Sequence, residues 1–237
     1  MASPLSRVNV RADLWETLWS FAHRVLAINL LLALAGTPLM LALSLVATPW
    51  SYPVFFGLLA LPLAPAAAAA FGYLALEDPR PPLSSLFRLA VSRARRSLLI
   101  AVIAAALIGV LAADIKVLIA SYPGAVPLLV VLLSLVAVGA LNALVLVGAP
   151  PLTSEDSPTT AARLSDVVGI WGVVRLAVYS GVRGWGLSLL SLGVLFAALV
   201  IVSQAPLAGL VTVPGCALWV VHTNSQAQLA RIMRRIG

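Results

Sequence analysis

The segment RLAVSRARR, residues 88–96, separates two long apolar runs and decides how the rest of the chain is organised. It holds four of the 15 Lys and Arg residues. From residue 83 to residue 94 the apolar side chains recur at intervals of three and four residues, and three of the four arginines fall on the opposite face. This pattern predicts an amphipathic helix that lies at a membrane interface, with its apolar face toward the lipid, and leads into a membrane span.

The composition excludes an ordinary soluble domain. Of the 237 residues, 62% are hydrophobic and 10% are charged, and the mean hydropathy is +1.07, whereas soluble domains carry about 25% charged residues. Apolar runs of about 20 residues, the length that crosses a bilayer as a helix, recur along the chain. We therefore expect an all-α polytopic membrane protein in which residues 1–237 form a single transmembrane domain.

Six apolar runs are long enough to be spans, and they pair as three hairpins. Before each hairpin the sequence predicts a cytoplasmic interfacial amphipathic helix. The first covers residues 8–22 and carries two tryptophans, which favour the interface, and the third falls within residues 160–184. Because the first apolar run is longer than the core of a signal peptide, we expect it to remain in the mature protein. The predicted spans are residues 25–48, 54–76, 98–119, 126–148, 186–204 and 206–226.

The distribution of charge predicts the orientation. With six spans, all 14 arginines fall on one side of the membrane and Lys116, the only lysine, falls on the other. Positively charged residues favour the cytoplasmic side. We therefore expect both termini in the cytoplasm and the chain in the plasma (inner) membrane of a bacterium. A seventh span at residues 167–182 would place Arg231, Arg234 and Arg235 outside, and the charge rule disfavours it.

A second basic segment repeats the spacing of the first. Arg175 and Arg183 are eight residues apart, as are Arg88 and Arg96, and each pair precedes a predicted span. Two explanations stay open: an internal duplication, or independent use of one pattern for leading a helix into the bilayer. Parallel repeats occur in transporters, but duplication also occurs in proteins that transport nothing.

Four short motifs in the first half of the chain are similar to those of a known family. They are NLL at 29–31, PAAAA at 65–69, LFR at 86–88 and RRSLL at 95–99. Over about residues 15–110 the chain resembles the YesL-like family of bacterial membrane proteins, a domain of unknown function. The resemblance implies a membrane protein encoded beside carbohydrate ABC importers and glycan-degrading enzymes, with no established activity of its own.

The chain contains few groups that could do chemistry inside a membrane. Catalysis needs titratable or nucleophilic side chains held together, and the sequence has neither a Ser-His-acid arrangement nor a phosphate-binding glycine loop. Two histidines, His23 and His222, and one cysteine, Cys216, are too few for a metal site or a disulfide. We expect no enzyme activity, no cofactor and no metal. The net charge of +7 comes from arginines beside the spans, where anionic lipid headgroups are the expected partner and nucleic acid is not.

Two groups of residues are candidates for function. Polar residues in the cytoplasmic third of the spans could line a cavity for a ligand, or could make hydrogen bonds between helices; they are Asn29, Asn142, His222 and Asn224. Arginines of the interfacial segments could hold the protein to anionic headgroups, or could dock a partner; they are Arg88, Arg93, Arg95, Arg96, Arg175 and Arg183.

These observations favour a non-catalytic accessory protein that packs against another membrane complex, such as a carbohydrate ABC importer. The alternative is a small-molecule permease or lipid flippase that uses the polar cavity near the inner leaflet. A membrane enzyme is the least favoured of the three.

Overall fold

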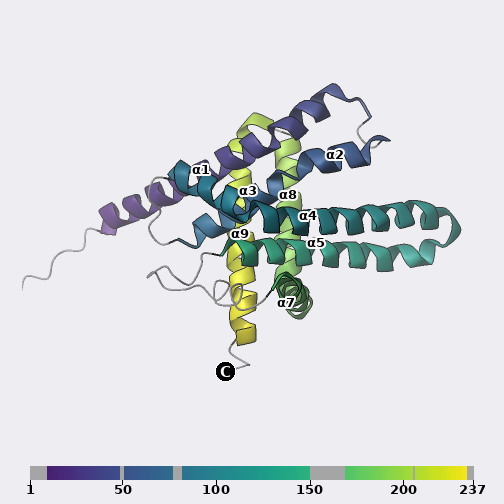
Figure 1. Ribbon diagram of the computed structural model, residues 1–237. Helices are drawn as coiled ribbons and strands as arrows, with labels where there is room; N and C mark the ends of the chain where they lie inside the picture. Colours follow the sequence, from purple (N-terminus) through teal and green to yellow (C-terminus); the bar gives the residue numbers. More distant parts are fainter. Residues whose placement is uncertain (1–9, 49–50, 77–81, 150–168, 205, 234–237) are drawn as a thin grey trace, which may run out of the picture.

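Figure 1 shows the computed structural model of the chain, which describes residues 10–48, 51–76, 82–149, 169–204 and 206–233. Every regular element of these residues is a helix, which confirms the all-α prediction for this part of the chain. The predictions that concern residues 8, 9 and 160–168, and those for Arg234 and Arg235, lie outside it. The elements are α1 (Val10–Leu45), α2 (Pro53–Ala60), α3 (Leu63–Leu74), α4 (Pro82–Ser121), the 3-10 turn η2 (Pro123–Ala125), α5 (Val126–Gly148), α7 (Ile170–Arg183), α8 (Trp185–Gln204) and α9 (Pro206–Met233).

Five helical segments of the described chain are long and apolar enough to cross a membrane, as expected of a multi-pass membrane protein. They correspond to the first five predicted spans. The sixth, residues 206–226, lies in α9, which is not one of the five, and it stays a prediction. The five segments are Leu18–Leu45, Pro53–Leu74, Leu83–Ser121, Pro123–Gly148 and Trp185–Gln204.

The second span is broken into α2 and α3 by Pro62. Proline has no N–H to give to the carbonyl four residues earlier. The carbonyl of Leu58 instead accepts the N–H of Leu61 at 3.2 Å, and the carbonyl of Leu61 accepts the N–H of Ala64 at 3.1 Å. These tighter turns keep the backbone hydrogen-bonded through the break, which an apolar environment requires.

Two of the three predicted interfacial helices are not separate elements. Helix α1 runs without interruption through residues 10–45, and α4 runs through residues 82–121. Neither glycine nor proline occurs in residues 10–35 or 83–108, so nothing in these sequences ends the helix between its basic part and its apolar part. Only α7 is separated from the span that follows, at Gly184. The arrangement of three hairpins with separate interfacial helices is therefore not confirmed.

Small residues set the packing of α3 against α5. The alanines of α3 from Ala66 to Ala70 are mostly buried. Gly72 of α3 and Gly148 of α5 lie where the two backbones approach most closely. A Cβ atom on Gly72 would collide with the carbonyl oxygen of Gly148, and a Cβ on Gly148 would collide with that of Ala68. Backbones that approach this closely are typical of helix association in membranes.

The helices do not all run in one direction. Figure 1 shows α4 and α5 side by side, while α8 and α9 form a second pair that runs across them, and α7 is seen nearly end-on below this crossing. Helix α9 also lies against α1 at Gly215, which has room for no side chain beside Val25 and Asn29. A set of six spans all parallel to one another is therefore not what the described residues form.

Candidate functional site

Asn142 joins three helices. It is buried on α5, and its Oδ1 accepts a hydrogen bond from Ser225 Oγ of α9 at 2.7 Å. Its Nδ2 lies 3.4 Å from three acceptors: the carbonyl of Ala177 and Ser180 Oγ, both on α7, and Gln228 Oε1 on α9. The amide thus uses both its donor and its acceptor groups on other helices, which is the interhelical role left open for it by the sequence.

Gln228 extends this polar cluster toward α8. Its Nε2 donates to Ser188 Oγ at 3.2 Å and lies 3.4 Å from the carbonyl of Gly184. A Cβ atom on Gly184 would lie 2.7 Å from Gln228 Cγ, so only glycine leaves room for this side chain. A separate contact is made by Asn224, whose Nδ2 donates to Ser191 Oγ at 3.1 Å. The two contacts join α9 to the first half of α8.

Asn29 makes its contact at another level of α9. It is buried on α1, and its Oδ1 accepts the backbone N–H of Gly215 at 2.5 Å. Pro214 precedes Gly215 inside α9, and a proline disturbs the hydrogen bonding of the turn in which it lies. The side chain of Asn29 therefore accepts a backbone hydrogen bond from α9 at the residue after its internal proline.

His222 has no hydrogen-bond partner on its Nδ1 atom in the described chain, although that atom is buried. Its ring lies against that of Phe71 on α3, with centroids 6.2 Å apart and an angle of 18° between the planes. One turn later on α9, the buried Nε2 of Gln226 also has no partner there. These two side chains are the polar groups that the helices around them do not satisfy.

The contacts of Asn29 and Asn142 lie at different levels of the structure. The partners of Asn29 and Asn142 on α9, Gly215 and Ser225, are ten residues apart, or about 15 Å along the helix. Sequence reasoning missed Ser180, Ser225 and Gln228 as members of the cluster. The spacing of Ser225 and Gln228 by three residues, which puts both on one helical face, was the available signal.

The six candidate arginines have two different surroundings. Arg93 is partly buried and its Nη2 donates to the carbonyl of Ala149 at 2.9 Å, just after the end of α5. The others are exposed, and Arg183 donates to the hydroxyl of Tyr179 at 3.1 Å. Arg24, which sequence reasoning did not select, resembles Arg93: its Nη1 donates to the carbonyl of Leu76, after the end of α3, at 3.0 Å.

Two hollows lie away from all of these residues. A groove of about 670 Å³ runs between α2 and α4, and a cavity of about 100 Å³ lies between α4, α5 and α7. None of the ten candidate residues lines either of them. Among the described residues no group of three or more His, Cys, Asp or Glu side chains could hold a metal ion.

Comparison with protein-family models, with curated proteins and with solved structures finds no match to this chain. The YesL-like resemblance therefore rests on the four short motifs alone.

Proposed function

We propose that the chain is an integral membrane accessory protein, without catalytic activity, that packs against another membrane complex such as a carbohydrate ABC importer. The proposal includes membership of the YesL-like family and six spans in a bacterial plasma membrane with both termini in the cytoplasm. It assigns the exposed arginines to the anionic inner surface of that membrane, where each basic residue contributes about 1 kcal/mol to attraction.

The observation that supports the proposal is the set of hydrogen bonds that the Asn142 side chain makes to other helices. Its hydrogen bonds end on α7 and α9, so the most elaborate polar cluster of the described chain stabilises the fold. Large apolar side chains meanwhile remain exposed along α4 and α5, among them Val110, Val117, Leu128 and Val131. Exposed apolar surface of this kind is covered by lipid or by another membrane protein.

Photo-cross-linking in the native membrane tests the proposal. A photoreactive amino acid is placed at one exposed position in each of three regions: Phe55 on α2, Val131 on α5 and Phe196 on α8. We expect a protein adduct of defined mass from at least one position, retained on purification in gentle detergent, with the partner identified by mass spectrometry. Lipid adducts alone at all three positions, together with a lone monomer on purification, would contradict the proposal.

The alternative function, a small-molecule permease or lipid flippase, is favoured by one observation. His222 and Gln226 lie one turn apart on α9 with buried nitrogen atoms that the described helices leave without partners, which suits a polar interior. For this function, Asn29→Leu and Asn142→Leu should abolish uptake or lipid movement in proteoliposomes while the protein still folds. For the accessory function, the unmodified chain alone should move neither substrate nor lipid in proteoliposomes, and the same variants should lose stability.

A further inference from the structure

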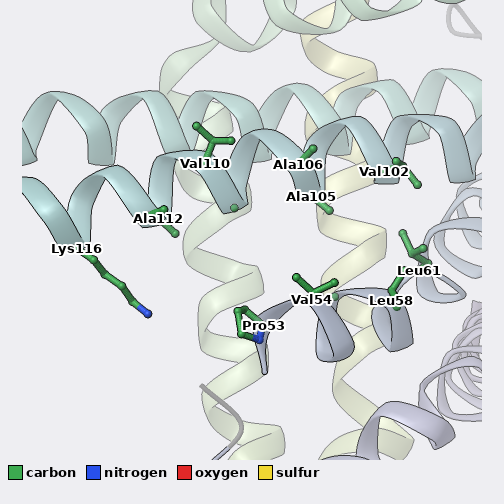
Figure 2. A pocket seen from close by; sticks show the side chains of 13 residues that line it. Pro53, Val54, Leu58, Leu61, Val102, Ala105, Ala106, Val110, Ala112 and Lys116 are labelled. Atoms are coloured by element: carbon green, nitrogen blue, oxygen red, sulfur yellow. The ribbon is translucent and has the colours of Figure 1, made fainter. Parts of the chain in front are cut away.

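The groove between α2 and α4 is lined almost entirely by carbon. Pro53, Val54 and Leu58 of α2 face α4 across it, with Leu61 at its inner end (Figure 2). Its volume is about 670 Å³, and it is open along one side. The residues of α4 that line it run from Val102 to Lys116, a length of about 21 Å at the rise of a helix.

The side of the groove formed by α4 consists mostly of small residues: Ala105, Ala106, Gly109, Ala112 and Ala113. Nothing lies within 4 Å of a Cβ atom built on Gly109, or on Gly57 across the groove. Gly72 and Gly148 are glycines because two backbones touch there, whereas Gly57 and Gly109 border space that the described chain leaves unfilled. The groove is thus an apolar surface hollow without large side chains on its α4 side, and it has room for a narrow apolar group such as an acyl chain.

A single positively charged side chain, that of Lys116, lies at one end of this groove. Lys116 is the only charged residue that lines it, and Figure 2 shows its side chain extending from α4 toward the start of α2 at Pro53. Asp114 is two residues away on the same helix, and residues at that spacing do not face one another. The nearest basic residue earlier on α4, Arg96, is about 30 Å away along the helix. The groove between α2 and α4 is therefore apolar along its length and carries one positive charge, at the end where Lys116 lies.

We propose that this groove binds one anionic phospholipid, with an acyl chain along its alanine and glycine side and the phosphate beside Lys116. One leaflet of a bilayer has an apolar depth of about 15 Å, which the groove spans. An apolar helix of a partner would fill the apolar body but would leave the ammonium group without a partner, whereas a phospholipid matches both parts. The proposal needs the membrane setting but does not depend on a partner complex.

Lipid titration of the purified full-length chain in detergent, followed by native mass spectrometry, tests this assignment. The probes are phosphatidylglycerol and phosphatidylcholine with identical acyl chains. We expect phosphatidylglycerol to bind about fivefold more tightly, the effect of one interfacial cation, and Lys116→Gln to remove that preference. Gly109→Leu should weaken binding of both lipids by about tenfold or more, because the leucine fills the groove and displaces the chain.

Matched controls separate these effects from general ones. Gly193→Leu adds the same side chain at an exposed glycine of α8 that also has nothing within 4 Å of a Cβ atom, and it should bind like the unmodified chain. Asp114→Asn removes a charge of the opposite sign beside Lys116, so it should keep or increase the preference for phosphatidylglycerol and should not lower it. Should Gly109→Leu fail to fold, as judged by circular dichroism and size exclusion, Gly57→Leu fills the groove from α2.

Three results would overturn the assignment. The first is equal binding of the two lipids to the unmodified chain, and the second is an unchanged preference in Lys116→Gln. The third is unchanged binding to a folded groove-filling variant. A protein adduct from a photoreactive residue at Val110, which lines the groove, would identify a partner helix as the occupant instead. The partner proposal can fail or succeed independently, because lipid binding is measured on the isolated chain.

Discussion

Asn142 is the residue on which three helices depend, and its replacement gives the clearest test at this scale. Asn142→Leu leaves Ser225 and Gln228 without the amide atoms they contact. We expect a loss of about 1–2 kcal/mol in the free energy of unfolding, from broken interhelical hydrogen bonds and buried groups left unpaired. Steric-trapping or thermal unfolding in detergent measures it. Ser134→Ala is the control, since its hydroxyl bonds only within α5; equal losses from both would contradict the role of the cluster.

Arg93 provides a second test, because it acts on a helix end. Its guanidinium donates to the carbonyl of Ala149, the residue just after the end of α5, and positive charge at a helix C-terminus is favourable. Arg93→Ala should reduce the free energy of unfolding by about 1–2 kcal/mol. Arg95→Ala, two residues away and exposed, should change it by less than about 0.5 kcal/mol. Indistinguishable unfolding curves for the two variants would show that Arg93 is only a surface charge.

Single residues were the hardest part of the molecule to predict from sequence. The amides Asn29 and Asn142 could be selected because polar side chains inside apolar runs must find partners. Which partners they find depends on how α9 lies against α1 and α5, and no local pattern contains that information. The same holds for Arg24 and Arg93: nothing in the sequence distinguishes them from surface arginines, yet each donates to a carbonyl just after the end of a helix.

At the scale of the helices, glycines of two kinds give opposite predictions. Gly148→Ala places a methyl group against the backbone of α3, and we expect a loss of about 1–3 kcal/mol in stability. Gly109→Ala faces open space, so the higher helix propensity of alanine should leave stability unchanged or raise it by up to about 1 kcal/mol. Thermal unfolding of the two variants checks this difference in sign. A gain in Gly148→Ala would mean that α3 and α5 are not as close as the structure has them.

The helices themselves were largely predictable, and their interruptions only in part. Apolar runs of span length predicted α4, α5 and α8, because few other structures satisfy the backbone in lipid. The structure does not separate interfacial from spanning helices at residues 22–25 and 96–98, since the sequence holds no glycine or proline there to end a helix. The sequence predicted one uninterrupted span at residues 54–76. The break at Pro62 is explained by the missing N–H of proline.

At the scale of the molecule, the crossing of α8 and α9 over α4 and α5 was not predictable. Charge and hydropathy report which residues lie in the membrane and on which side, but they contain nothing about the angle between hairpins. The pairs meet in contacts such as Ser225 with Asn142, which join residues 83 positions apart in the chain. The number of spans and their orientation therefore need a measurement of their own.

Thiol labelling in intact cells is that measurement, because the proposed topology places the arginine-rich segment at residues 88–96 and Lys116 on opposite sides of the membrane. The background is Cys216→Ser, which removes the only cysteine, and Ser92→Cys and Lys116→Cys are examined separately with a reagent that does not cross membranes. We expect labelling of Lys116→Cys in intact cells, and labelling of Ser92→Cys only after the membrane is opened. Labelling of Ser92→Cys in intact cells, or of both positions from the same side, would contradict the proposed topology.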